Sequence, residues 1–346
     1  MSTLPAAAAT EPTPFEYLVQ LSAGYMPASA LYFTTKLGIP DLLAHGPQPV
    51  SELAGRTGTN EDALYRVLRM LASLGVYNEV GLRHFKLTPV SDQLRSDHPQ
   101  SVRPLALWMG NPFHLRAYAE VMHSLRTGQT CVERVTGGLP VFEYFEKDKE
   151  VATEFNDAMT NLSMVCIPPV LDAYDFSGIR TLVDVAGGHG TVAGLILQRY
   201  PEMRAIVYDL PHVISGAPAR LAQLGVAERC STATGDMFKA VPSGDAYIMK
   251  HIIHDWDDDR CVTILRNCMA AMTDRKQGRV ILIEAVIEPG NARDFGKMID
   301  YEMLVMPGGR ERTAGEFEEL FKRAGLRLER IVQTAGPLSV VEARPE

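Results

Sequence analysis

The chain lacks the features that mark several large classes of protein. Among its 346 residues are only five cysteines, none in a C-x-x-C pair, and 34 Lys and Arg against 42 Asp and Glu, for a net charge of −8. So few cysteines, in an odd number, argue against a disulfide framework and favour a reduced, cytoplasmic protein. The negative charge disfavours nucleic acid or an anionic membrane surface as a partner.

The N-terminus also lacks a targeting signal. Residues 1–12 are rich in alanine, are interrupted by proline, and contain neither a basic region nor a long apolar run. We therefore expect a flexible tail there, and neither a signal peptide nor a membrane span. The rest of the chain shows no repeats or low-complexity tracts, and its length allows two domains with an ample core.

A strand–loop–helix–strand unit occupies residues 181–209, which read TLVDVAGGHGTVAGLILQRYPEMRAIVYD. An apolar run at Thr181–Val185 precedes a glycine cluster, and a helical pattern then leads to a β-branched strand that ends on Asp209. Glycines let the backbone approach a ligand closely, and an acid about 20 residues further on can accept both hydroxyls of a ribose. The unit therefore predicts a nucleoside-binding site.

The identity of the nucleoside stays open at this point. Gly188, Gly190 and Ala193 satisfy the G-x-G-x-x-A pattern of dinucleotide sites, so an NAD-dependent oxidoreductase is an alternative. Asp184, just before the glycines, is better suited to a cationic amino group than to a pyrophosphate.

Strands and helices alternate after this unit, which predicts a doubly wound α/β sheet closed by an antiparallel hairpin at Leu326–Gln333 and Leu338–Ala343. The expected helices are Val213–Leu224, Asp257–Met272 and Thr313–Ala324. In such sheets a ligand binds at the carboxyl ends of the strands. Polar residues occur at these strand ends: Asp184, Asp209, Asp236, Lys250, His254 and Glu284.

The N-terminal region predicts a helical module with a small wing. Phe15–Leu43 has helical periodicity, Asn60 caps a helix over Glu61–Leu74, and two short strands flank a turn at Gly81. This outline also fits a winged-helix DNA binder. Positions 51–103 hold seven basic and six acidic residues, a net charge of +1 that is too small for binding the phosphate backbone of DNA. We therefore expect a module that pairs two copies of the chain or serves as a scaffold.

Two further segments carry candidate site residues. Positions 104–174 are rich in aromatic residues, and Phe155, Met159 and Ser163 share one helix face that is suited to line a pocket. In KHIIHDW at Lys250–Trp256, His254 is a candidate general base, since histidine has an unperturbed pKa near 6.5. A metal site built on His251 and His254 is less favoured, because helix capping explains the acids that follow.

From about Phe15 to Val341 the chain resembles the plant-type, metal-independent small-molecule O-methyltransferases that use S-adenosylmethionine, such as those acting on caffeate, flavonoids and acetylserotonin. The resemblance rests on LVDVAGGHG, YDLPHV, GDMF, MKHIIHDW and GGRERT, in this order. It implies a mainly helical winged-helix dimerisation domain at 13–105, hence a homodimer. It also implies a Rossmann-like methyltransferase domain at 106–346 that includes a helical substrate-pocket segment. One departure is Ala186, where the family usually has glycine.

The resemblance, together with the residue patterns, implies a set of site residues. His254 is the expected base, with Glu284 and Glu311 as carboxylates that orient it. The expected acceptor pocket contains Phe155, Met159, Asp255, Trp256 and Met303. The residues expected at S-adenosylmethionine, whose product is S-adenosylhomocysteine, are Ser163, Asp184, Gly187, Gly188, Asp209, Leu210, Asp236, Met237, Phe238 and Lys250.

The implied reaction moves the methyl group of S-adenosylmethionine to a hydroxyl of a small, flat acceptor, without a metal. Phenols, hydroxyindoles, phenazines, polyketides and carotenoids all remain open as acceptors. A second alternative is a methyltransferase-fold enzyme that uses the same cofactor for a different reaction on a polyketide-like compound.

Overall fold

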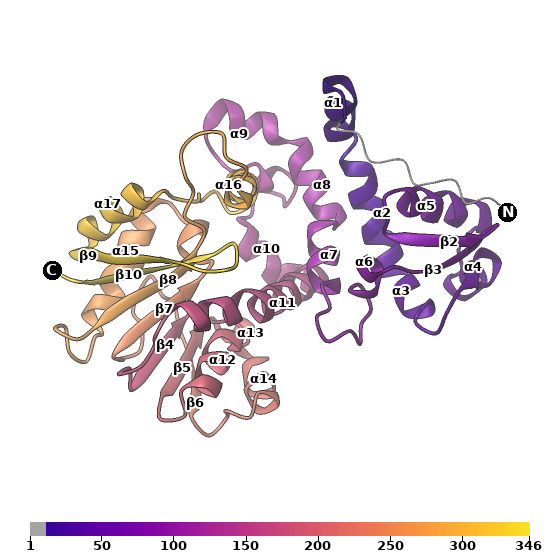
Figure 1. Ribbon diagram of the computed structural model, residues 1–346. Helices are drawn as coiled ribbons and strands as arrows, with labels where there is room; N and C mark the ends of the chain where they lie inside the picture. Colours follow the sequence, from indigo (N-terminus) through magenta and orange to yellow (C-terminus); the bar gives the residue numbers. More distant parts are fainter. Residues whose placement is uncertain (1–11) are drawn as a thin grey trace. The chain divides into compact units, whose positions relative to one another are not determined.

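The computed structural model describes residues 12–346 and divides into two compact units, Met1–Pro112 and Phe113–Glu346 (Figure 1). The tail predicted at residues 1–12 lies outside the described residues except for its last residue. No helix among the described residues is long and apolar enough to cross a membrane.

The N-terminal unit is mainly helical and carries a three-stranded antiparallel sheet in the order β1-β3-β2. Its elements are α1 (Pro14–Ser22), α2 (Tyr25–Lys36), α3 (Ile39–Leu42), β1 (Gln48–Pro49), α4 (Val50–Thr57), α5 (Glu61–Ser73), β2 (Tyr77–Gly81), β3 (His84–Leu87), α6 (Pro89–Asp92) and α7 (Arg103–Met109). The predicted cap of α5 is present, since Asn60 Oδ1 accepts the N–H of Ala63 at 3.0 Å. Strands β2 and β3 form the predicted wing.

The predicted helical segment Phe15–Leu43 is three helices. It breaks between α1 and α2, and again at Gly38, which has a left-handed φ of 71° that favours glycine. Helix α1 buries none of its residues, and Phe15, Leu18 and Leu21 are 76, 63 and 61% exposed. A single chain therefore presents a row of large apolar side chains to solvent at this helix.

The C-terminal unit begins with helices and continues as an α/β sheet. Its helices before the sheet are α8 (Pro112–Ala119), α9 (Val121–Thr127), η1 (Val132–Arg134), α10 (Val141–Lys147) and α11 (Lys149–Ala173). The alternating part comprises β4 (Thr181–Val185), α12 (Thr191–Arg199), β5 (Arg204–Asp209), α13 (Pro211–Ile214), α14 (Ala217–Gln223), β6 (Cys230–Thr234), β7 (Ala246–Lys250), η2 (Ile253–Asp255), α15 (Asp258–Ala270), β8 (Arg279–Glu284), α16 (Phe295–Val305), α17 (Ala314–Ala324), β9 (Leu326–Gln333) and β10 (Ser339–Pro345).

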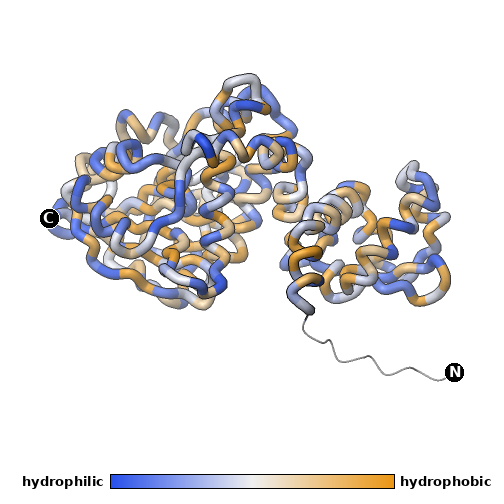
Figure 2. The backbone as a smooth tube through the Cα atoms, turned by 90° about the horizontal axis from the view of Figure 1, so that it is seen from above, coloured by the Kyte–Doolittle hydropathy of each residue, from blue (hydrophilic) through white to orange (hydrophobic). Residues whose placement is uncertain are grey.

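The seven strands lie in the order β6-β5-β4-β7-β8-β10-β9, with the first five parallel and β10 antiparallel to both its neighbours. The order reverses between β4 and β7, and this switch point is where doubly wound sheets bind their ligands. Helices cover both faces: α11, α12 and α14 pack on one face, and α15 and α17 on the other (Figure 1). Apolar residues concentrate along the interior of this unit, and hydrophilic ones lie on its outer turns (Figure 2).

Three details differ from the sequence prediction. The helix expected over Val213–Leu224 is two short helices, α13 and α14, separated by Ser215 and Gly216. Helix α16 was not predicted, because its apolar residues follow an irregular loop that contains Pro289 and Gly290. Strand β10 lies inside the sheet between β8 and β9, because the terminal hairpin folds back against β8.

Candidate active site

The loop after β4 is a cradle of backbone with little room for side chains. A Cβ added to Gly187 would lie 2.6 Å from Cγ of Asp184, and Gly188 and Gly190 have left-handed φ values of 57° and 75°. Ala186, in the place of a family glycine, also has a left-handed φ, of 54°. The N–H of Gly188 donates to Oδ2 of Asp209 at 2.8 Å, so the acid at the end of β5 holds the loop. This geometry leaves space for a ligand against the backbone.

Buried charges lie beside this cradle. Asp184 is 1% exposed and accepts the N–H of Ala193 at 3.1 Å, and burial raises the pKa of its carboxyl to about 7. Burial also raises the pKa of Asp209, whereas it lowers the pKa of Lys250 at the end of β7. Buried ionisable groups with shifted pKa values are expensive in a protein interior and are typical of functional sites.

A cavity of about 360 Å³ opens over the cradle, at the carboxyl ends of the parallel strands. All ten predicted cofactor residues line it: Ser163, Asp184, Gly187, Gly188, Asp209, Leu210, Asp236, Met237, Phe238 and Lys250. Four of the five predicted acceptor residues line it as well: Phe155, Met159, Asp255 and Trp256. Met303 is the exception, because it is buried in α16 and is not among the lining residues.

One wall of the cavity is aromatic. The ring of Phe142 on α10 lies 5.5 Å from that of Trp256 and 6.3 Å from that of Phe155, and Phe238 meets Trp256 edge-on at 4.9 Å. Phe145 adds a further ring 5.0 Å from Phe155. Such a wall favours a flat, apolar ligand over an extended polar one.

Sequence reasoning did not select several lining residues. Phe142 and Phe145 were noted only as part of an aromatic-rich stretch, yet their i, i+3 spacing on a short helix was the available signal. His189 was passed over although it lies inside the glycine cluster, and its Nδ1 is 3.1 Å from the hydroxyl of Thr160. Asn156 and Thr160 on α11 carried no signal beyond sharing a helix with Phe155.

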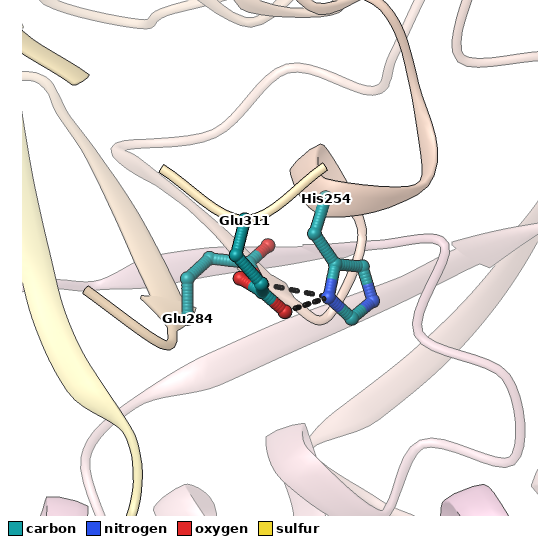
Figure 3. Close-up of side chains that lie close together, drawn as sticks. All are labelled: His254, Glu284 and Glu311. Atoms are coloured by element: carbon teal, nitrogen blue, oxygen red, sulfur yellow. Dashed lines mark hydrogen bonds and ion pairs between the residues drawn. The ribbon is translucent and has the colours of Figure 1, made fainter. Parts of the chain in front are cut away.

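His254, Glu284 and Glu311 come together from three different segments, next to the cavity-lining Asp255. Nδ1 of His254 is 2.7 Å from Oε1 of Glu311 and 3.8 Å from Oε2 of Glu284. The three residues are 6, 0 and 3% exposed. Figure 3 shows both glutamates facing the same ring nitrogen, while the other nitrogen points away from them. Nε2 has Asp255, a cavity-lining residue, at 3.5 Å.

The carboxyls around His254 are poised to titrate near neutrality. Burial raises the pKa of Glu284 and of Asp255 to about 7, and that of Glu311 to about 8. Positive charge at His254 opposes the shift at Glu284 and Asp255. A proton gained by the imidazole would lower the pKa of these carboxyls, and the ionised carboxylates would then stabilise the imidazolium.

Two conserved-domain models match the chain. The O-methyltransferase domain covers residues 118–327, and the O-methyltransferase dimerisation domain covers residues 19–97. The curated phenazine O-methyltransferase PhzM of Lysobacter antibioticus is 44% identical over 329 residues, which cover 95% of each chain.

Solved structures agree with this match. The crystal structure of LaPhzM superposes with a TM-score of 0.93 at 43% identity and covers 97% of this chain and 100% of that one. The O-methyltransferase NcsB1 of neocarzinostatin biosynthesis, solved with S-adenosylhomocysteine and 1,4-dihydroxy-2-naphthoic acid, has a TM-score of 0.82 at 29% identity, covering 97% of this chain and 100% of that one. The chain belongs to the O-methyltransferase family, with the family's Rossmann-like catalytic domain and its N-terminal dimerisation domain.

Proposed function

We propose that this protein transfers the methyl group of S-adenosylmethionine to a hydroxyl of a small aromatic acceptor, with His254 as the general base and without a metal ion. The observation that carries the proposal is the 2.7 Å contact between Nδ1 of His254 and Glu311. A carboxylate at Nδ1 fixes the tautomer in which Nε2 is free to take a proton, and Nε2 lies on the side of the cavity-lining Asp255.

The cavity fits the cofactor. Asp209 ends β5 where a ribose-binding acid is needed, and Asp236, Met237 and Phe238 offer a polar edge and two apolar surfaces for an adenine. The cradle at Gly187 and Gly188 leaves room for the remaining part of the molecule. When bound, S-adenosylmethionine supplies a methyl group that its sulfonium charge has already activated, so the chain has to orient the acceptor and remove one proton.

His254 performs the proton step in this proposal. Its Nε2 takes the proton of the acceptor hydroxyl while the oxygen attacks the methyl carbon, and the resulting imidazolium is held by Glu311 and, at longer range, Glu284. The aromatic wall of Phe142, Phe155 and Trp256 then holds the acceptor ring. This wall supports a flat polycyclic acceptor over a single small ring.

Metal independence is supported by the hydrogen bonds of His254, Glu284 and Glu311. These three residues are the only cluster among residues 12–346 whose spacing could suit a metal ion. Oε1 of Glu311 is taken by the imidazole, and Oε1 of Glu284 accepts the N–H groups of Ile252 and Ile253 at 3.0 Å.

The proposal extends to the assembly of the protein. Residues 13–105 form the dimerisation domain and 106–346 the methyltransferase domain with its helical pocket segment, so that the working enzyme is a homodimer. The exposed apolar row on α1 supports it. We also propose a cytoplasmic location, which the five free, buried cysteines support.

The test is a transfer assay with methyl-labelled S-adenosylmethionine and a panel of hydroxylated aromatics with one, two and three fused rings. Each acceptor is paired with its amino counterpart, so that transfer to nitrogen is detected separately, and each reaction is run with and without EDTA. Labelled ether product that needs His254 and survives EDTA supports the proposal. Hydride exchange with NAD, or transfer lost on chelation, would contradict it.

A further inference from the structure

Arg312 is the largest fully buried residue of the C-terminal unit, and the donors of its guanidinium point at the turn that carries His254. Arg312 is 1% exposed. Its Nη1 donates to the carbonyl oxygen of Ile253 at 3.0 Å, and its Nη2 donates to that of Trp256 at 3.0 Å. Nε and Nη2 also reach Oδ1 of Asp258, at 3.2 and 2.8 Å.

These two carbonyls bracket His254 and Asp255 in the chain. The N–H groups at the start of the same turn, from Ile252 and Ile253, donate to Glu284. The backbone around the imidazole is thus held by an anion through its N–H groups and by a cation through its carbonyls. Both are buried, so the hydrogen bonds do not compete with water.

The segment Gly308–Arg312 approaches this turn as closely as backbone can. A Cβ at Gly309 would overlap the carbonyl oxygen of His254. The next residues place Glu311 against Nδ1 and the guanidinium of Arg312 against the flanking carbonyls. One short segment therefore fixes both the ring of His254 and the backbone from which the ring projects.

A purely structural ion pair would not need this arrangement. Asp258 is 32% exposed at its side chain and also pairs with Arg310 at 2.9 Å and with Arg323, so Arg312 is not required to satisfy it. Burying a guanidinium is costly, and two of its three carbonyl contacts, those to Ile253 and Trp256, are on the turn that carries His254. The third is to the carbonyl oxygen of Arg310, at 3.3 Å.

We propose that Arg312 is a positioning residue for His254. By holding the carbonyl groups of Ile253 and Trp256, it fixes the position and orientation of the imidazole relative to the cavity. The inference rests on the proposed function, because it assigns Arg312 to the placement of the base in methyl transfer. Misplacing a reacting group by about 1 Å can cost on the order of a hundredfold in rate.

The charge of Arg312 adds a second effect on the same site. The charged groups around Glu311 are, by element, His254 and Asp255 on η2, Glu284 on β8, Asp300 and Asp294 at α16, and Arg312 in the same segment. Burial and Asp300 raise the pKa of Glu311, and Arg312 opposes them. Removing the cation raises this pKa further, so that a higher pH is needed before Glu311 is ionised.

The experiment compares Arg312→Met, Arg312→Lys and a matched control, Arg310→Met. Arg310 pairs with the same aspartate but is 48% exposed and donates to no carbonyl of the turn. For each folded variant, kcat, the KM of the acceptor and the pH profile of kcat are measured, with the Kd of S-adenosylmethionine from calorimetry.

We expect Arg312→Met to lower kcat about a hundredfold, to leave the cofactor Kd within about twofold, and to move the acid limb of the profile to higher pH. Arg312→Lys keeps the charge and should keep the acid limb while losing about tenfold in kcat, since one ammonium cannot reach both carbonyls and the aspartate in the same geometry. Arg310→Met should stay within about twofold of the wild type.

Normal kcat per folded molecule in either Arg312 variant overturns the inference, as does a fall in melting temperature alone. If Arg312→Met does not fold, Arg312→Lys decides: a lowered kcat with intact cofactor binding supports the positioning role, and wild-type kcat refutes it. A wild-type enzyme that methylates no hydroxyl in the panel is a different outcome, which sinks the proposed function itself.

Discussion

Replacing Glu311 with glutamine should slow methyl transfer more than the same change at Glu284. Glu311 Oε1 lies 2.7 Å from Nδ1 of His254, whereas the nearest oxygen of Glu284 lies 3.8 Å away. Oε1 of Glu284 also accepts two backbone N–H groups, and the side-chain oxygen of glutamine in Glu284→Gln can accept them equally well. The sequence alone treats the two glutamates as equivalent; the distances rank them.

The magnitude follows from the type of hydrogen bond. A bond to a charged group contributes about 1.5–3 kcal/mol and a neutral one about 0.5–1.5 kcal/mol. Glu311→Gln keeps an acceptor but loses the charge, a difference of roughly 1.4 kcal/mol when the imidazolium forms, or about tenfold in kcat. Glu284→Gln acts only at longer range and should cost about threefold or less.

The assay is the initial rate of labelled methyl transfer to an ordinary phenol, at a pH below the pKa of that phenol so that a base is needed. His254→Ala should abolish turnover and leave cofactor affinity nearly unchanged, since His254 is not one of the ten residues expected at the cofactor. Equal rates for wild type and Glu311→Gln, or a larger loss in Glu284→Gln, would refute this account of the base.

Four other outcomes are expected. Asp209→Ala should weaken S-adenosylmethionine binding by roughly 1.5–3 kcal/mol in calorimetry, because it removes a charged ribose acceptor and the anchor of Gly188; unchanged affinity would contradict this. The protein without cofactor should melt at lower temperature as pH rises from about 4.5 to 8, because carboxyls with raised pKa values favour folding only while protonated, and Glu284→Gln should flatten that dependence. Binding of S-adenosylmethionine at pH 7 should release more protons than binding of S-adenosylhomocysteine, because its extra positive charge lowers the pKa of Asp184 and Asp255. Calorimetry in buffers of different ionisation enthalpy measures this difference. Sedimentation should show a dimer, whose interface we expect to bury more than about 2,000 Å². Leu18→Glu should weaken this dimer, because Leu18 belongs to the exposed apolar row on α1; a stable, active wild-type monomer would argue against it.

Local patterns were enough to predict the sheet and the glycine-rich loop after β4. The apolar run of β4, the glycines after it and Asp209 at the end of β5 form one continuous stretch, and their geometry depends mainly on neighbours in sequence. Capping was equally local, since the side chain of Asp257 accepts the N–H of Arg260 at the start of α15. The family resemblance extended these predictions to the order of domains.

The surroundings of His254 could not be predicted in the same detail. Glu284 and Glu311 lie 30 and 57 positions beyond it, so their distances depend on how β8 and the loop before α17 pack. Met303 was expected in the acceptor pocket, yet α16 buries it away from the cavity-lining residues. Arg312 had no signal of its own, because a basic residue next to a site is usually exposed.

Burial around His254 also favours the neutral form of the carboxyls beside it. Around His254 and the cavity, Asp184, Asp255, Glu284 and Glu311 all have raised pKa values, so near pH 7 part of the carboxylate charge is lost to protons. Asp184 and Asp255 line the cavity, so a cationic ligand there lowers their pKa and restores the ionised state. A neutral ligand of the same shape gives no such gain. If the proposed function holds, a bound sulfonium should leave Asp184 and Asp255 more fully ionised than a neutral ligand does.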